Sequence, residues 1–299
     1  MIAASSSDVV PVGSTPRRIS FSRSSAVRSA VMIRRDQRSI TACGVLAGAA
    51  RLTAALAFLA AAAAPGAGLA QPAGIDPQAE KLLKASMTYL AGLKRFSADT
   101  RSTIEFVTTW GQKLQFDNAV TMAVQRPNKL WAARTGDLVD QVFYYDGKLL
   151  TLHNPSEKVY ATVPAPGTLE EMLDFARESL DIVAPGGDFV YKNAFEILMQ
   201  DVKTGFVVGK GVVDGVRCDH LAFRAPHVDW QIWIQEGKQP LPRKIVITST
   251  DIAGAPQFAV VMTKWNLAPK FADGKFTFTP PKGARTIEFL PLGKAGAVR

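Results

Sequence analysis

Residues 103–125 read TIEFVTTWGQKLQFDNAVTMAVQ, and the spacing of apolar residues in this stretch decides the fold class. Before Gly111, Ile104, Phe106 and Trp110 alternate with polar neighbours. After Gly111 the alternation resumes at Leu114, Phe116, Val120, Met122 and Val124. Because successive side chains of a strand point to opposite faces, a period of two predicts strands buried on one face. We expect a long antiparallel hairpin with one face in water.

Further strands are predicted at short spacing along the chain. They lie at Lys129–Thr135, Leu138–Tyr145, Lys148–His153, Lys158–Val163, Gly205–Val213, Val216–Arg224, Trp230–Gln235, Lys244–Thr250, Phe258–Asn266 and Lys275–Thr279. The pairs Asp146-Gly147, Asp214-Gly215 and Asp273-Gly274 favour tight turns, because Asp and Gly tolerate a positive φ. These connections are too short to link separate domains, which favours a single sheet.

Three segments predict helices instead. Asp76-Pro77 offers an N-cap followed by a first-turn proline. Thr168 and Glu171 form a capping box, which satisfies backbone N–H groups at a helix start. A second short helix is predicted over Phe189–Gln200. We therefore expect a mainly β fold with inserted helices: a single curved antiparallel sheet, an N-terminal helix and a helical lid over 168–200.

The first 70 residues predict export. Arg34, Arg35 and Arg38 precede the uncharged run Leu52–Ala64, and Ala67-Gly68-Leu69-Ala70 follows ahead of Gln71, which is the order of a secretory leader. The apolar run counts 13 residues, whereas a membrane-spanning helix needs about 20. We expect residues 1–70 to be an N-terminal extension with a cleavable signal peptide, translated from Met32. Residues 71–299 are expected to form one periplasmic domain without a transmembrane segment.

Charge and cysteine count narrow the classes of partner and of stabilising bond. The leader holds eight of the 35 Lys and Arg residues and two of the 26 acids, which lowers the net charge from +9 to +3. Nucleic acid is excluded as an expected partner, because phosphate binding needs a concentrated basic surface. Cys43 lies in the leader and Cys218 stands alone in the mature part, so no internal disulfide is expected there.

Short segments spread over the mature chain carry a family resemblance. They are Val163-Pro164-Ala165, TLE at 168–170, CDHLAFR at 218–224, DWQIWI at 229–234, LPRK at 241–244, GAPQ at 254–257, WN at 265–266 and FTFTPP at 276–281. With these segments the chain resembles a family of predicted periplasmic proteins, the domain of unknown function 2092. That family is more distantly similar to the lipoprotein carriers LolA and LolB. The resemblance implies an unclosed antiparallel barrel, covered by helices around an apolar cavity that receives acyl chains. It implies no catalytic residue and no particular ligand.

Four residues in the segment 218–229 form the best candidate metal site in the sequence. Cys218 and His220 lie two apart on a predicted strand and face the same way, and His227 and Asp229 follow after a short loop. Zinc accepts these ligand types, but the CxH…HxD spacing fits no common zinc pattern. A buried Cys and a hydrogen-bonded His are ordinary in a core, so we expect no metal and no cofactor. The sequence also lacks the GxSxG and HExxH motifs of common hydrolases, so binding is favoured over catalysis.

The candidate ligand site is an apolar layer between the strands and the lid. Its members are Phe106, Trp110, Phe116, Phe143, Tyr145, Met172, Leu173, Phe175, Trp230, Ile232 and Ile234. The same pattern is the signature of a helix packed on a half-buried sheet, and this alternative stays open. The first hypothesis is a non-enzymatic carrier for a lipid, an acyl chain or a lipidated protein. The alternative is an envelope regulatory or scaffold protein that binds another protein, and the third is a hydrolase or metal-binding protein.

Overall fold

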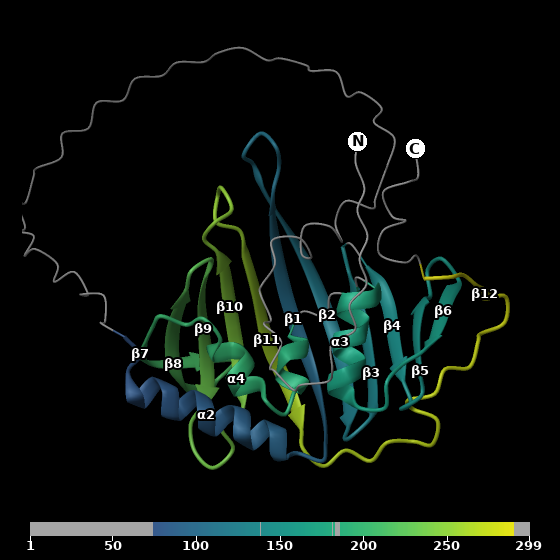
Figure 1. Cartoon of the computed structure of the whole chain (residues 1–299), viewed down its shortest axis with the longest axis horizontal. Helices are drawn as coiled ribbons and strands as arrows, with labels where there is room; N and C mark the ends of the chain where they lie inside the picture. Colours follow the sequence, from purple (N-terminus) through teal and green to yellow (C-terminus); the bar gives the residue numbers. More distant parts are fainter. Residues whose placement is uncertain (1–73, 138, 181, 183–185, 290–299) are drawn as a thin grey trace, which may run out of the picture.

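The structure, a computed structural model, describes residues 74–289 apart from 138, 181 and 183–185 (Figure 1). The predicted signal peptide and the start at Met32 lie outside the described residues. The same holds for residues 71–73 and 290–299 of the expected domain. Within the described part, the helices gather on one side of a single broad sheet (Figure 1).

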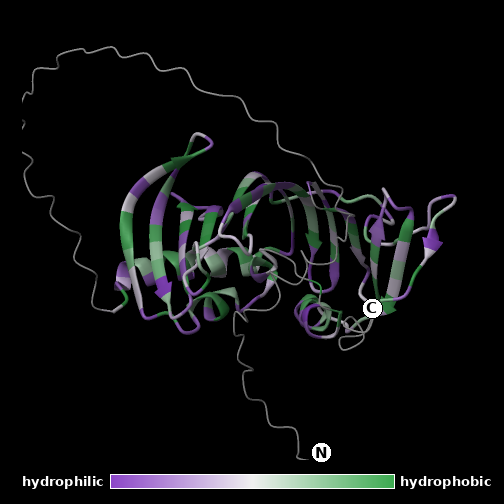
Figure 2. Ribbon diagram, turned by 90° about the horizontal axis from the view of Figure 1, so that it is seen from above, coloured by the Kyte–Doolittle hydropathy of each residue, from purple (hydrophilic) through white to green (hydrophobic). Residues whose placement is uncertain are grey.

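Twelve strands form this sheet in the described residues, in the order β12-β6-β5-β4-β3-β2-β1-β11-β10-β9-β8-β7. Their bounds are β1 Arg95–Val107, β2 Lys113–Gln125, β3 Lys129–Gly136, β4 Asp140–Tyr145, β5 Leu149–Asn154, β6 Val159–Pro164, β7 Thr204–Val213, β8 Val216–Ala225, β9 Val228–Gln235, β10 Pro242–Ser249, β11 Gln257–Asn266 and β12 Arg285–Thr286. All neighbours are antiparallel except β12 and β6. The sheet is curved but does not close, because β7 and β12 remain edges (Figure 2). The predicted fold class is confirmed.

The first and the last long strands meet in the middle of the sheet. β1 pairs with β2 along its whole length, which confirms the hairpin predicted from residues 103–125. On its other side β1 pairs with β11, where Thr100 lies opposite Met262. Strands β1–β6 therefore meander to one side and β7–β11 to the other, and the lid helices come from the connection between the two runs. Asp214 and Gly215 turn β7 into β8 with φ values of 46° and 78°, as the Asp-Gly pair predicted.

The N-terminal helix α2 spans Pro77–Gly92 and confirms the predicted start. The Asp76 carboxylate accepts a hydrogen bond from the Gln78 N–H at 2.8 Å, which satisfies one of the free donors of the first turn. Leu83, Met87 and Leu90 lie on its buried face. The helix crosses one end of the β7–β11 half and contacts β7 and β9 (Figure 1).

Helix α3 spans Leu169–Leu180 and begins with the predicted capping box. The Thr168 hydroxyl accepts from the Glu171 N–H at 3.2 Å and donates to the Glu171 carboxylate at 2.8 Å. The helix predicted over 189–200 is wrong as one element, because the chain forms a 3-10 turn η1 (Gly187–Val190) and a short helix α4 (Ala194–Met199). Tyr191 between them is extended, with its hydroxyl held by Asp174 and Arg177 of α3. This tertiary anchor interrupts the helical path.

The predicted strand 275–279 is also wrong. This segment crosses the outer face of the β4–β6 region as an irregular strap, in which the Phe278 ring lies 5.0–5.3 Å from the rings of Tyr144, His153 and Tyr160. Backbone groups inside a sheet are already paired, so a segment lying on its face packs through side chains and does not add a strand. Pairing resumes at the sheet edge, where β12 runs beside β6.

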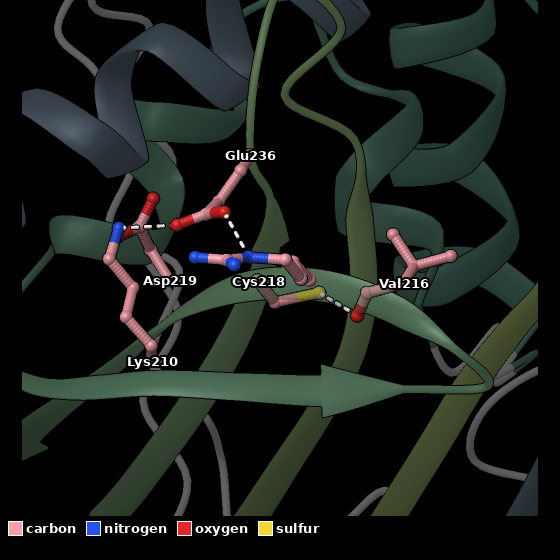
Figure 3. A network of polar contacts seen from close by, with 6 residues as sticks. Lys210, Val216, Cys218, Asp219 and Glu236 are labelled. Atoms are coloured by element: carbon pink, nitrogen blue, oxygen red, sulfur yellow. Dashed lines mark hydrogen bonds and ion pairs between the residues drawn. The ribbon is translucent and has the colours of Figure 1, made fainter.

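A charged network joins the edge strand β7 to β8 and to the end of β9 (Figure 3). The Lys210 ammonium lies 2.5 Å from an Asp219 carboxylate oxygen and 2.6 Å from Glu236, and Glu236 also pairs with Arg217 at 3.0 Å. Hydrogen bonds from Lys210 and then Arg217 lower the pKa of Glu236 below its ordinary value. The network links the side chains of these strands at the surface, where exposed ion pairs contribute little to stability.

Candidate functional site

An apolar cavity of about 170 Å³ lies between α3 and the concave face of the sheet. It is lined by Thr100, Ser102, Ile104, Phe106, Asn118, Val120, Met122, Leu130, Ala132, Arg134, Val139, Phe143, Leu150, Met172, Leu173, Ala176, Ile182, Gly186, Gly187, Val190, Phe258 and Val260. A buried water needs only about 10–15 Å³ of such space. We call this space the main cavity. It is large enough for part of a slender apolar guest.

Two smaller cavities adjoin the main cavity. One, of about 30 Å³, lies beside Phe189, Trp230 and Ile245 and shares Gly186 and Phe258 with the main cavity. The other, of about 40 Å³, reaches Leu90, Phe96 and Trp265 and shares lining residues of β1, β2 and β11 with it. The apolar space therefore extends from under α3 toward α2 and toward β9.

Helix α3 is tied to the sheet at its beginning. The Leu169 N–H donates to the Pro127 carbonyl oxygen at 2.9 Å, and the Arg126 guanidinium lies 3.4 Å from the Glu170 carboxylate. The Tyr145 hydroxyl donates to the Pro166 carbonyl oxygen just before the helix. Burial, followed by the nearby acids, raises the pKa of Tyr145 to about 12, so the hydroxyl stays a donor at neutral pH. These contacts set which residues of α3 face the cavity.

The later part of α3 is held by a polar cluster with η1. The Tyr191 hydroxyl donates to Asp174 at 2.8 Å and accepts from Arg177 at 2.9 Å, and Arg177 lies 3.6 Å from Asp188. Burial raises the pKa of Asp188, Arg177 opposes this rise, and Asp174 adds to it. Burial likewise raises the pKa of Tyr191. Met172, Leu173 and Ala176 line the cavity on the apolar side of α3.

The main cavity has one polar region. Ser102, Asn118 and Arg134 lie on three adjacent strands, and the register places Ser102 opposite Asn118 and Asn118 opposite Gly136. The buried Asn118 Oδ1 and Arg134 Nε atoms have no hydrogen-bond partner among the described residues. Burial lowers the pKa of the Arg134 guanidinium, with no offsetting carboxylate. The group remains charged at neutral pH because its ordinary pKa exceeds 12.

The predicted cavity residues divide between the cavity, the core and the surface. Four of them line the main cavity: Phe106, Phe143, Met172 and Leu173. Trp230 lines the 30 Å³ cavity, and Tyr145, Ile232 and Ile234 are buried in the core. Phe116 packs edge-on against Phe106 at 5.6 Å, and Phe175 is half-buried on α3. Trp110 is 76% exposed at the end of the β1–β2 hairpin, outside the cavity. Its alternation with Ile104 and Phe106 ends because β1 stops at Val107 and the chain turns.

The strand residues of the metal candidate have other partners. The Cys218 thiol is buried and donates to the Val216 carbonyl oxygen at 3.4 Å, and burial raises its pKa. His220 stacks on Trp233 with ring centroids 3.9 Å apart and hydrogen-bonds Gln231 at 3.0 Å. Burial lowers the pKa of His220. Both residues therefore take part in the packing of β8.

The other two metal candidates also have partners of their own. The Asp229 carboxylate accepts two hydrogen bonds of 2.7 Å from Arg224, and His227 lies 3.7 Å from Asp251. Within residues 74–289, with the gaps given above, no group of three or more His, Cys, Asp or Glu side chains is placed to hold a metal ion. No helix in the described part of the chain is both long and apolar enough to span a membrane.

Sequence reasoning missed the polar region of the cavity, although a signal was present. The apolar alternation of β2 passes from Phe116 to Val120, and Asn118 is the polar residue in phase between them. In β3 the phase of Leu130 and Ala132 continues at Arg134. A polar residue in phase with apolar ones on a buried face marks a group that needs a partner.

Comparison with known proteins identifies the family. Residues 79–290 match the family described as "Predicted periplasmic protein (DUF2092)", and the chain belongs to this family of predicted periplasmic proteins. Among curated proteins, none matches the chain.

Several solved structures are similar to this chain at low sequence identity. LprF from Mycobacterium bovis is 16% identical, with 71% of this chain and 100% of that chain covered and a TM-score of 0.42. A LolA superfamily protein from Nitrosomonas europaea is 12% identical, with 67% and 97% covered and a TM-score of 0.31. The MucA/MucB complex of Pseudomonas aeruginosa is 11% identical, with 68% and 61% covered and a TM-score of 0.37. At these TM-scores the likeness carries no argument about function.

Proposed function

We propose that this protein is a non-enzymatic periplasmic binding or carrier protein, which holds a lipid, an acyl chain or the acyl chain of a lipidated protein. The observation that carries the proposal is the main cavity, an apolar space of about 170 Å³ between α3 and the concave face of the sheet. Strands from both halves of the sheet contribute to its wall, and α3 covers it.

The free energy available in this cavity suits reversible binding. Burying one methylene gains about 0.8 kcal/mol, so about five methylenes in the main cavity gain roughly 4 kcal/mol before ordering costs. The adjoining cavities offer room for a longer chain. A gain of this size alone corresponds to roughly millimolar affinity at best, so a tightly held guest must also use the adjoining cavities or a polar contact.

Helix α3 is the element proposed to act as the lid. Its first turn is anchored by the capping box and by contacts to Pro127 and Arg126, whereas Met172, Leu173 and Ala176 rest on the cavity. If these three residues moved away from the sheet, the cavity wall would be exposed to solvent. The anchored first turn would keep the helix in position to return.

Titration of delipidated protein with a fluorescent fatty acyl probe tests this proposal. We expect saturable uptake near one probe per chain, and native mass spectrometry of the freshly purified protein should detect a copurifying lipid. A folded, delipidated protein that takes up no acyl probe, and that carries no lipid when first purified, would contradict the proposal.

A second candidate function is binding to another protein through the edge of the sheet. Edge strand β7 carries two exposed valines, Val208 at 46% and Val212 at 67% exposure. Residues 74–76 form backbone hydrogen bonds with this edge strand at Gly205, near its beginning. An unpaired strand edge with apolar side chains can accept a partner strand. Crosslinking that recovers a stoichiometric protein partner, lost on Val212→Lys, would favour this function, and recovery of none would count against it.

A further inference from the structure

Arg134 is the only charged side chain that lines the main cavity in the described residues. It lies on β3 with Val120 of β2 and Gln141 of β4 as its direct neighbours across the sheet. Most of the wall around it is aliphatic or aromatic. A wholly apolar guest would gain nothing from this charge, and removing the guanidinium from water costs free energy.

No residue in the described part of the chain neutralises Arg134. Its Nε atom is buried and has no hydrogen-bond partner, and none of the ion pairs found there involves it. The carboxylate of Asp137, in the following turn, accepts instead from the Asp117 N–H at 2.8 Å. A buried charged donor without a partner is costly, so Arg134 needs a partner that the described residues do not supply.

Arg126 also has buried nitrogen atoms in this region, but it has an ion-pair partner within the chain. Its NH1 atom lies 3.4 Å from the Glu170 carboxylate. Among the residues that the structure describes there is therefore an anion for Arg126 and none for Arg134. The difference lies in position, because Arg126 faces the start of α3 whereas Arg134 faces the cavity.

Asn118 adds a second polar group to this part of the wall, and its amide oxygen needs a hydrogen-bond donor. Its Oδ1 atom is buried without a hydrogen bond on the strand next to Arg134. Gly136 lies opposite, and a Cβ atom there would come within 2.7 Å of this oxygen, so the glycine leaves space beside the amide. With Ser102 on the next strand, the polar groups gather near the β3–β4 turn. Leu130 and Met172 line the apolar remainder.

We propose that the main cavity binds an amphiphile with a carboxylate head group, whose head is held by Arg134 and whose aliphatic chain runs toward Leu130 and Met172. The planar guanidinium presents paired N–H donors that match the two oxygens of a carboxylate. The Ser102 hydroxyl and the amide N–H groups of Asn118 can donate further hydrogen bonds to the carboxylate at the same end, whereas the Asn118 oxygen only accepts. This inference rests on the proposed function and names the ligand class of the same site.

The test compares two probes with the same aliphatic chain on delipidated protein at neutral pH: cis-parinaric acid, whose head group is charged, and its methyl ester, whose head group is neutral. We expect the wild type to bind the acid at least tenfold more tightly than the ester. In Arg134→Gln the acid should lose about 10–100-fold in affinity, because a charge-assisted hydrogen bond is lost. The ester should change by less than about twofold, since it never used the charge. Arg101→Gln, on the outer face of β1 and 68% exposed, is the control and should bind both probes as the wild type does.

The outcomes separate this inference from the proposed function. Equal affinity of the wild type for acid and ester would overturn the head-group assignment and leave the carrier proposal standing. Binding of neither probe would remove both. If lysophosphatidic acid displaced the acid probe more strongly than oleate did, the head group would be a phosphate and the carboxylate assignment would fall. The comparison of wild-type affinities needs no variant, so it decides even if Arg134→Gln does not fold.

Discussion

The two buried arginines are expected to affect stability in opposite directions. Arg134→Met removes a half-buried charge that has no ion-pair partner among residues 74–289 as far as they are described, so the free energy of unfolding of ligand-free protein should rise by about 1 kcal/mol. Arg126→Met leaves the Glu170 carboxylate without its cation and frees the start of α3. The Arg126 side chain is only 7% exposed, and breaking such a pair costs roughly 3–5 kcal/mol when it is fully buried. Because Glu170 is partly exposed, we expect a loss of about 2 kcal/mol.

These changes are large enough to measure. For a domain of this size, 1 kcal/mol shifts Tm by about 2–4 °C, so Arg134→Met should raise Tm by about 3 °C and Arg126→Met should lower it by about 6 °C. Urea unfolding of delipidated protein, followed by tryptophan fluorescence, gives the free energies, and equal m-values would confirm that the same surface unfolds. A loss of stability in Arg134→Met would refute the reasoning, because it would mean that the guanidinium has a stabilising partner within the chain.

Three other predictions concern the lid. Ala176→Phe places a ring in the main cavity and should lower acyl-probe affinity at least tenfold, while the free energy of unfolding changes by less than about 2 kcal/mol. The control is Ala85→Phe, on the exposed side of α2. Unchanged probe binding by Ala176→Phe would exclude the main cavity as the binding site. Thr168→Ala breaks the capping box and should cost about 1 kcal/mol in urea unfolding, whereas no measurable change would mean that packing alone holds α3. Because burial raises the pKa of Asp188, the folded state holds this proton more tightly than the unfolded state, and the resulting stability is lost as pH rises through that pKa. Stability of Asp188→Asn should therefore fall less than that of the wild type between pH 4 and pH 7, and parallel pH profiles would contradict this.

Local patterns predicted most of the secondary structure. The period of two around residues 103–125 predicted the β1–β2 hairpin, because one face of each strand is buried and the other is not. The Asp76 cap and the Thr168 capping box predicted where α2 and α3 begin, since these side chains satisfy donors within one turn of themselves. The strand predicted at 275–279 was wrong, because Phe278 packs on the face of the sheet and the segment does not pair as a strand.

The candidate site was predictable in part. The strand and helix patterns placed Phe106, Phe143, Met172 and Leu173 on apolar faces, and these residues line the main cavity. The same patterns could not separate cavity lining from solid core, because Tyr145 and Ile232 have equally apolar surroundings in sequence but are fully packed. The same patterns could not exclude Trp110 from the cavity lining. Its position continues the alternation of β1, but the strand ends three residues earlier.

The paired strands from β1 to β11, the starts of α2 and α3 and the Asp-Gly turn at 214–215 could be predicted from the amino-acid sequence, because each depends on neighbours a few residues apart or on short motifs. The pairing of β1 with β11, the open edges of the sheet and the cavity beneath α3 are apparent only in three dimensions. Those outcomes depend on contacts between residues more than a hundred positions apart, such as Thr100 with Met262. The same holds for Arg134, because the described elements around it leave its buried Nε atom without a hydrogen-bond partner.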